Sequence, residues 1–342
     1  MDLNKINKMP PKRCIALFSG GLDSLLAVKL IKQQNIDVVI LNFDHGFFFG
    51  SYEIINGEKK YKGKLPPDFN VTVIDISVDF YKMIKKPEFG FGSNMNPCID
   101  CKIMMLKKAK TLVPDFDASF VITGEVLGQR PMTQNLRAMK LIEEKSGLTG
   151  FLLRPLSAKK LEITEPEKFG WVDREKLLDI EGRSRKIQLS LAEKWGIADY
   201  VKTPAGGCVL TDENYSKRLK DLIDNKKEIT RENVELLTMG RQFRKQGVKF
   251  IIGRKKEENF YLLKFKDKAT VFDCIDVPGP VGITFDTIDE NMENFIASAV
   301  AGYSDGKKLQ EVKIEITNKQ DKKILKVKPM DINELGKNRI DK

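Results

Sequence analysis

The chemistry that this chain suggests begins with one short segment, residues 19–24, which could bind phosphate groups. It reads Ser-Gly-Gly-Leu-Asp-Ser and lies between an apolar run at 13–18 and a stretch with helical periodicity at 22–34. Gly20 and Gly21 permit a tight turn and let backbone N–H groups approach an anion closely. The start of the following helix adds partial positive charge. The segment therefore predicts a phosphate-binding loop.

Side chains of the same loop supply donors and a metal ligand. Ser19 and Ser24 offer hydroxyl groups, and Asp23 is a candidate both for catalysis and for holding Mg²⁺ against the phosphates. The loop matches neither a Walker A sequence nor G-x-G-x-x-G, which excludes the common kinase-type and dinucleotide loops. Asp44 follows the next expected strand, where a ribose or Mg²⁺ contact and a simple turn fit the sequence equally well.

A second polar segment follows the expected strand 120–122 and reads Thr-Gly-Glu-Val-Leu-Gly-Gln over residues 123–129. In a parallel sheet, the segments that follow neighbouring strands come to the same edge. We therefore expect this segment to form the other half of the phosphate site, with Gly124 and Gln129 among the residues that bind the cofactor.

Three of the five cysteines are candidates for catalysis and for metal binding: Cys98 and Cys101, just before an expected helix, and Cys208, in a Gly-rich loop. One interpretation is a [4Fe–4S] cluster held by these three thiolates, with one iron left open. A persulfide and disulfide relay would need only two reactive thiols. Structural zinc normally takes four ligands, and the only histidine, His45, is in a different loop. We favour the cluster, because three cysteines and not four group together.

The elements that must position these residues alternate between strand and helix through the first half of the chain. Short apolar runs separated by helices are typical of a parallel sheet with helices on both faces. The expected strands are 13–18, 38–41, 71–76, 120–122 and 151–153, and the expected helices are 22–34 and 99–112. We therefore predict an α/β fold with a doubly wound parallel sheet for residues 1–212.

The pattern changes beyond residue 212. Residues 213–240 read as a charged helical connector, and residues 241–342 as a smaller basic α+β domain. Its expected elements are strands at 248–252, 260–263 and 270–272, a helix at 289–301, and a hairpin of strands at 312–316 and 324–327. The clean alternation of polar and apolar residues in the last two runs indicates the hairpin.

The charge of the chain favours a polyanionic partner. The formal net charge is +11, and residues 241–268 carry ten Lys or Arg against three Asp or Glu. With aromatic residues interleaved, this region reads either as an RNA-facing sheet or as a charged outer face over an aromatic core. The RNA-contact candidates there are Arg241, Arg244, Lys245, Arg254 and Lys255. Arg183, which precedes an expected helix, is either a further phosphate contact or part of a solvated face.

The loop at 19–24 resembles the pyrophosphate loop of the N-type ATP pyrophosphatases, the PP-loop family, whose catalytic domain has the adenine nucleotide alpha hydrolase-like fold. Gly-Glu-Val-Leu-Gly-Gln at 124–129, followed by Arg-Pro-Leu at 154–156, is similar to the catalytic domain of tRNA 4-thiouridine synthetases and related tRNA thiouridine synthetases. The resemblance covers residues 12–212. Residues from Met239 onward share a limited resemblance with the RNA-binding module of ribosome-quality-control proteins.

This resemblance implies a function and its cofactors. ATP would adenylate a uracil carbonyl of tRNA with release of pyrophosphate, and sulfur would then replace the oxygen, giving 4-thiouridine or 2-thiouridine. The implied cofactors are ATP and Mg²⁺, and some thiouridine synthetases carry the same three-cysteine arrangement around a [4Fe–4S] cluster. The implied partners are tRNA and a sulfur donor, either a cysteine desulfurase or inorganic sulfide.

Two other functions stay open at this stage. One is a PP-loop amide or nitrile synthase that acts on a small molecule, which would not need a basic second domain. The other is a non-catalytic protein that binds RNA and nucleotide without turnover. The sequence contains no apolar run near the ~20 residues that span a bilayer, so we expect a cytoplasmic protein with no membrane partner. A homodimer is compatible with the sequence.

Overall fold

A computed structural model describes residues 13–49, 51–200, 208–319 and 321–342. The chain divides into two compact units, Met1–Thr211 and Asp212–Lys342. The segment that we predicted as a connector, 213–240, forms two helices that belong to the second unit. Each unit is described by itself below.

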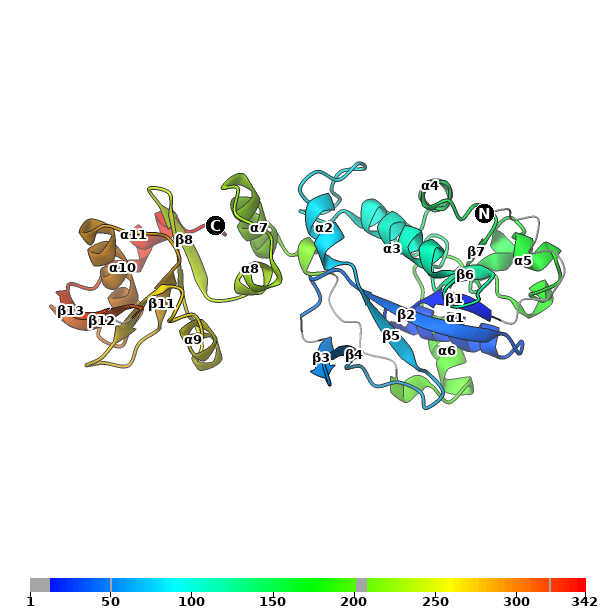
Figure 1. Cartoon of the computed structure of the whole chain (residues 1–342), viewed down its shortest axis with the longest axis horizontal. Helices are drawn as coiled ribbons and strands as arrows, with labels where there is room; N and C mark the ends of the chain where they lie inside the picture. The colour runs from blue at the N-terminus through cyan, green and yellow to red at the C-terminus, as the bar shows by residue number, and fades with distance from the viewer. Residues whose placement is uncertain (1–12, 50, 201–207, 320) are drawn as a thin grey trace. The chain divides into compact units, whose positions relative to one another are not determined.

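The first unit is built on a parallel sheet of five strands in the order β5-β2-β1-β6-β7 (Figure 1). The strands are β1 (Arg13–Leu17), β2 (Asp37–Asp44), β5 (Val71–Asp75), β6 (Phe120–Thr123) and β7 (Leu152–Leu153). β1 and β6 are buried almost throughout, as expected for central strands covered on both faces. The chain leaves β1 toward β2 on one side and returns to β6 on the other. This reversal makes the carboxyl ends of β1 and β6 the expected place for a ligand.

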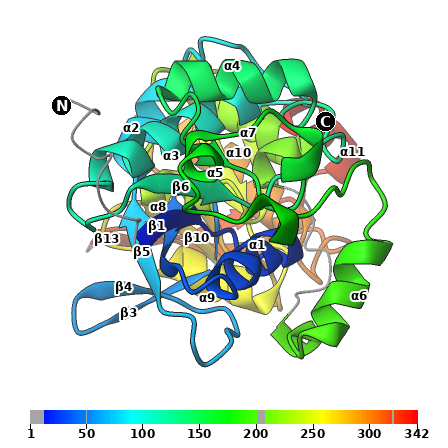
Figure 2. The same cartoon turned by 90° about the vertical axis from the view of Figure 1, so that its right-hand side faces the viewer.

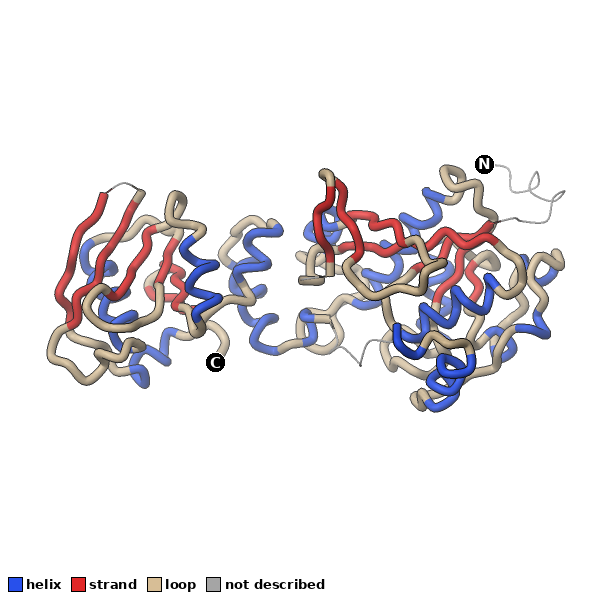
Figure 3. Tube along the Cα trace, turned by 90° about the horizontal axis from the view of Figure 1, so that it is seen from below, coloured by secondary structure: helices blue, strands red, loops and turns tan. Residues whose placement is uncertain are grey.

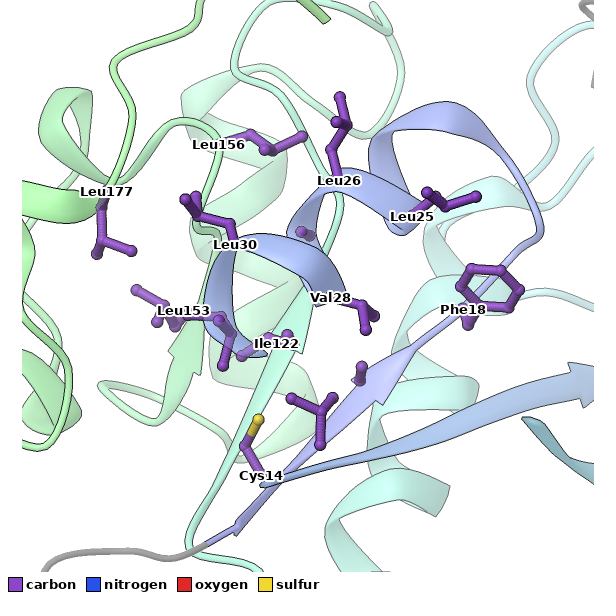
Figure 4. Close-up of a cluster of buried hydrophobic side chains, with 14 of the residues drawn as sticks. Cys14, Phe18, Leu25, Leu26, Val28, Leu30, Ile122, Leu153, Leu156 and Leu177 are labelled. Atoms are coloured by element: carbon purple, nitrogen blue, oxygen red, sulfur yellow. The ribbon is translucent and has the colours of Figure 1, made fainter. Parts of the chain in front are cut away.

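Helices cover both faces of this sheet, which confirms the doubly wound α/β prediction (Figure 2). The helices are α1 (Leu22–Lys32), α2 (Ser77–Met83), α3 (Cys98–Leu112), α4 (Leu136–Ser146), α5 (Glu165–Lys168) and α6 (Lys186–Lys194). On one face, apolar side chains of α1 such as Val28 and Leu30 pack with Ile122 and Leu153 in one core (Figure 4). On the other face, Ile103 and Leu106 of α3 join a second core.

A small antiparallel hairpin interrupts the first unit between β2 and β5. It consists of β3 (Tyr52–Ile55) and β4 (Glu58–Tyr61). Tyr61 anchors it, because its ring packs edge-on against Phe18, which directly follows β1. Phe47, before the hairpin, is buried against Phe80 and belongs to the core.

The second unit is built on an antiparallel sheet of six strands in the order β13-β12-β10-β11-β9-β8. Figure 3 shows its strands in red with helices beside them. The strands are β8 (Arg241–Lys245), β9 (Val248–Ile252), β10 (Thr270–Cys274), β11 (Gly282–Thr284), β12 (Val312–Asn318) and β13 (Asp321–Val327). The helices are α7 (Glu213–Asp224), α8 (Arg231–Leu236), α9 (Lys256–Leu263), α10 (Glu290–Gly302) and α11 (Ile332–Leu335). Ile296 and Val300 of α10 complete the core against the sheet. The α+β prediction and the β12–β13 hairpin are confirmed.

One predicted strand in this unit is wrong. Residues 260–263 end helix α9 instead of forming a strand. The helix starts with Glu257 and Glu258 in its first turn, where negative charge is favourable. The four-residue apolar run at 260–263 is too short to distinguish strand from helix by its periodicity. Packing favours the helix here, because Tyr261 contacts Phe265, four residues later in the chain.

Candidate functional site

The predicted phosphate loop lies between β1 and α1, and its two serines organise it. Ser24 Oγ donates to the carbonyl oxygen of Gly21 at 2.8 Å and accepts from the Ser19 N–H at 3.3 Å. Gly20 has φ +76°, and a Cβ there would lie 1.9 Å from the Tyr61 hydroxyl. Glycine is therefore required at this position both for the turn and for the close approach of the hairpin.

Asp23, on the first turn of α1, has a buried carboxyl group. Burial raises its pKa, while Gln129 and the guanidinium groups of Arg185 and Arg130 act in the opposite direction. Its Oδ1 atom is buried and has no hydrogen-bond partner among the described residues. A buried carboxylate oxygen without a hydrogen-bond partner destabilises the fold unless a ligand or ion binds it.

More unpaired polar atoms gather around Asp23. Within the described ranges, the buried Nε of Arg185 and both amide atoms of Gln188 also lack hydrogen-bond partners. Arg185 and Gln188 both act on the Asp23 carboxyl, so α6 and the residue just before it contribute to the loop's surroundings. This donor and acceptor set, together with the helix N-terminus, fits a nucleotide phosphate with Mg²⁺.

Gly124 lets its backbone pack directly against the phosphate loop, because it has no side chain. A Cβ at this position would lie 2.4 Å from the Ser24 nitrogen and 2.6 Å from the Asp23 carbonyl oxygen. The segment after β6 is therefore packed directly against the backbone of the phosphate loop. Gln129, in the same segment, lowers the pKa of Asp23. The two halves that we expected at one edge of the sheet are brought together.

Asp44 is engaged by the hairpin. Its carboxylate is fully buried, accepts from Lys59 Nζ at 2.6 Å and from the Gly46 N–H at 2.9 Å. Lys59 also pairs with Asp75 at the end of β5. The Lys59 ammonium group thus forms ion pairs with carboxylates at the ends of two neighbouring strands, β2 and β5. The ribose or Mg²⁺ role that we predicted for Asp44 stays a prediction, and any such ligand would share the carboxylate with Lys59.

The three candidate cysteines lie within mutual electrostatic reach. Cys98 and Cys101 start α3, and Cys208 directly precedes a short helical turn, 209–211. Burial, and then the neighbouring Cys208 thiol, raises the pKa of Cys101. Burial also raises the pKa of Cys208 to about 11, with a further contribution from Cys98. Two loops far apart in sequence therefore place three thiols together.

These thiols do not form a ready metal site in the part of the chain that the structure describes, where no group of three or more His, Cys, Asp or Glu side chains is arranged to hold a metal ion. The Cys98 thiol instead donates to Asn96 Oδ1 at 2.9 Å. Three thiols are the donor type that an iron–sulfur cluster requires, but their placement here does not test that prediction.

A buried ionic network that our sequence analysis missed connects the thiols to the phosphate loop. Glu125, next to Gly124, is held by Arg154 Nε at 3.3 Å and by Lys102 Nζ at 3.6 Å. Although burial opposes ionisation, Lys102 and Arg154 keep the pKa of Glu125 below its ordinary value. Lys102 also lowers the pKa of Cys101. In the sequence, Lys102 directly follows Cys101, and this adjacency could have indicated a cation beside the thiol.

Most of the basic residues predicted to contact RNA in the second unit are used internally. Arg244 donates to both oxygens of Asp221, at 2.7 and 2.9 Å. Arg254 pairs with Glu258 at 2.7 Å, and the Arg241 guanidinium lies over the Tyr303 ring at 4.3 Å. Lys245 lies over the ring of Phe295.

The aromatic residues of strands β8 and β9 are core as well, whereas Phe260, on helix α9, is exposed. Phe243 and Phe250 are fully buried and stack at a centroid distance of 5.1 Å. The charged-face interpretation that we left open describes this sheet better than an RNA-stacking platform. Lys255 precedes α9, and Arg183 is exposed just before α6. Their RNA roles stay predictions.

Comparisons with known proteins agree with this division. Residues 11–168 match the family model "Thiamine biosynthesis protein (ThiI)", and residues 240–339 match "NFACT protein RNA binding domain". A probable tRNA sulfurtransferase of Thermococcus kodakarensis is 27% identical over 52% of this chain and 42% of its own length. A tRNA sulfurtransferase of Desulfurococcus amylolyticus is 24% identical over 62% of this chain and 39% of its own. The chain thus spans about two fifths of the length of these relatives.

One solved structure, the C-terminal of the fibronectin/fibrinogen-binding protein from Streptococcus suis, aligns with a TM-score of 0.27 and 12% identity over 46% of this chain and 79% of that chain. That similarity is too low to support an argument. Among the described helices, none has the length and apolar character that a membrane span requires. The phosphate loop, the Gly124 segment and two of the three thiols all fall within the first matched range. Residues 11–168 are therefore similar to the ThiI family, and residues 240–339 are similar to the NFACT RNA-binding domain.

Proposed function

We propose that this protein is an ATP-dependent tRNA sulfurtransferase that adenylates a uracil carbonyl and replaces its oxygen by sulfur. One observation carries the proposal. The adjacent residues Gly124 and Glu125 link the two candidate centres, since Gly124 packs on the backbone of Asp23 and Ser24 while Glu125 holds Lys102 beside Cys101. ATP bound at the loop and sulfur carried by the thiols would then meet at one edge of the sheet.

The first step in this proposal is activation of the carbonyl. A uracil oxygen is a poor leaving group, whereas AMP is a much weaker base. The backbone N–H groups of the loop and the start of α1 would bind the phosphates and stabilise the departing pyrophosphate. Asp23 and its neighbours Gln188 and Arg185 supply the unpaired polar atoms for Mg²⁺ and phosphate oxygens.

The second step transfers sulfur. A sulfide equivalent forms the new bond to the activated carbon, and AMP leaves with the original oxygen. In a persulfide relay, one of Cys98, Cys101 and Cys208 would accept sulfane sulfur from the persulfide of a cysteine desulfurase. Inorganic sulfide would serve only the cluster alternative, in which these thiolates would hold the cluster and the open iron would supply a binding place for sulfide without a change of oxidation state. Burial raises the pKa of Cys101, and the Lys102 ammonium opposes this rise and would stabilise negative charge on sulfur. Either a persulfide relay or a [4Fe–4S] cluster on these thiols suits this role, and we continue to favour the cluster on the donor count alone.

The RNA part of the proposal rests on the relatives' names and on the RNA-binding match at 240–339. The site geometry leaves both 4-thiouridine and 2-thiouridine as products. Mass spectrometry of tRNA nucleosides from cells with and without the protein tests both points at once. Loss of one thiouridine in the deletion strain is the expected result. An unchanged nucleoside profile would refute tRNA thiolation and favour a small-molecule substrate.

The cysteine chemistry has its own test. Protein purified without air should be brown with about four irons per chain if a cluster is present. Cys98→Ala, Cys101→Ala and Cys208→Ala should each then lose iron and thiolation together. Cys14→Ala, in buried strand β1, is the control and should keep both. Full activity of iron-free protein with a sulfur donor would instead establish the persulfide relay and leave the ATP and tRNA proposals in place.

A further inference from the structure

An open groove with a surplus of positive charge lies within the second unit. Its volume is about 550 Å³, and six basic side chains line it against two acidic ones, Asp221 and Asp224. The basic residues are Lys217, Lys220, Arg244, Lys337, Arg339 and Lys342. One wall is helix α7, and the other is the segment 337–342, which Figure 1 places near α7 and β8.

A buried ion pair fixes the two walls to each other. Arg218 of α7 donates from Nε to Asp341 at 2.7 Å and forms a second bond to the same carboxylate through Nη2. Its remaining donors reach the carbonyl oxygens of Leu237 and Gly240 at 2.7 and 3.1 Å. Both charged side chains are nearly fully buried. The groove is therefore a built feature of the fold and not a gap between loose segments.

Several groove charges are already neutralised by protein partners. Asp221 is paired with Arg244 and with Lys249, so it offers little repulsion to an incoming anion. Lys217 pairs with Glu213. By contrast, Lys220 and Lys337 are exposed and have no ion-pair partner among the residues that the structure describes. Their ammonium groups are available to an external anion.

We propose that this groove binds the phosphate backbone of the tRNA through Lys220 and Lys337, and not through the internally paired Arg241, Arg244 and Arg254. The inference rests on the proposed function for the identity of the RNA, and it assigns the contact to residues outside the predicted set. No aromatic side chain lines the groove, so base stacking has no platform there. Ammonium groups together with Asn225 and Asn338 suit phosphate and 2′-hydroxyl oxygens.

The test is a binding titration of the full chain with an unmodified tRNA transcript at several salt concentrations, in the absence of ATP and sulfur donor. The double variant Lys220→Gln/Lys337→Gln should weaken binding roughly tenfold or more at ~0.1 M salt. The log–log salt slope should fall by about 1.4–1.8, since each of the two phosphate contacts contributes about 0.7–0.9. Lys326→Gln/Lys328→Gln is the matched control, because it removes the same charge from exposed lysines of the same unit outside the groove.

A loss of tRNA affinity confined to the groove variant supports the proposal. Equal losses in both variants, or no loss in the groove variant, overturn it.

Failure of the proposed sulfurtransferase function would give a different result from failure of the groove proposal. Protein that binds tRNA through the groove but never thiolates it would refute sulfur transfer and leave the groove intact. Normal thiolation and normal tRNA affinity in the groove variant would refute the groove alone.

Discussion

Two sites, one in each unit, treat buried charge in opposite ways. In the first unit, Asp23 and Arg185 carry buried atoms without hydrogen-bond partners among the described residues. In the second unit, the Arg218 guanidinium is occupied by Asp341 and by backbone carbonyls. Unpaired buried polar groups destabilise a fold, so their concentration at one loop indicates a place prepared for a ligand. The saturated pair in the second unit indicates a structural role.

The largest expected effect removes the charge at the phosphate loop. Asp23→Asn should reduce tRNA-dependent pyrophosphate release at least about 100-fold, because Mg²⁺ and phosphate positioning is lost. Its thermal stability should be unchanged or higher, since burial already disfavours the carboxylate. Asp37→Asn, at an exposed ion pair at the opposite end of the sheet, is the control and should turn over normally. Turnover by Asp23→Asn close to that of the wild type would remove the loop from the mechanism.

Breaking the Arg218–Asp341 ion pair should reduce the stability of the second unit. Asp341→Asn should lower the free energy of unfolding of the second unit by about 3–5 kcal/mol, because Arg218 keeps its buried charge without a counter-ion. Urea denaturation followed by far-UV circular dichroism measures this. The double variant Arg218→Met/Asp341→Leu should recover much of the loss. If both single and double variants were as stable as the wild type, the pair would have no structural role.

Gly124→Ala tests the contact between the two halves of the first site. Its Cβ would collide with backbone atoms of Asp23 and Ser24, which cannot move without displacing α1. We expect a loss of roughly 1–3 kcal/mol in stability, together with weaker ATP binding by calorimetry. Gly92→Ala is the matched control, since its Cβ would meet the flexible side chain of Met132. Equal stability of the two variants would show that the loop is not braced by Gly124.

The smallest effect concerns pH and sharpens the contrast between the units. In the second unit, burial lowers the pKa of Lys249 from 10.5 to about 8, against the attraction of Asp221 and with further lowering by Arg244. Between these two values the unfolded chain holds a proton that the folded chain lacks. The Lys249 contribution to stability therefore rises as pH rises through this window. Lys249→Met should flatten that part of the stability profile, whereas the exposed Lys326→Met should not.

The Cys208 thiol of the first unit should make stability fall, and not rise, with increasing pH. The pKa of Cys208 is raised from 9.0 to about 11, so the folded chain keeps a proton that the unfolded chain releases. Its contribution to stability is fully present below pH 9.0 and is lost as pH rises toward 11. Cys208→Ser should remove this loss in pH-dependent urea unfolding. Identical profiles for wild type and variant would mean that Cys208 is not held in its protonated form.

Local sequence determined the parts of this protein whose signals are short-range. The glycines and serines of 19–24 specify a turn between an apolar strand and an amphipathic helix, and that turn forms as expected. The alternation in 312–316 and 324–327 specifies a hairpin because side chains alternate between faces along a strand. The doubly wound sheet follows from apolar runs separated by helices, which can be buried in few other ways.

Only the tertiary structure decided which side chains meet. No sequence spacing places Arg185 and Gln188 beside Asp23, because α6 reaches the loop by packing on α1. Lys102 gains its partner Glu125 across the boundary between α3 and the segment after β6. The predicted RNA arginines of the second unit, Arg241, Arg244 and Arg254, had acidic or aromatic partners already, and a count of charges cannot reveal this. Composition gives the number of charges, whereas packing determines which of them remain free to act.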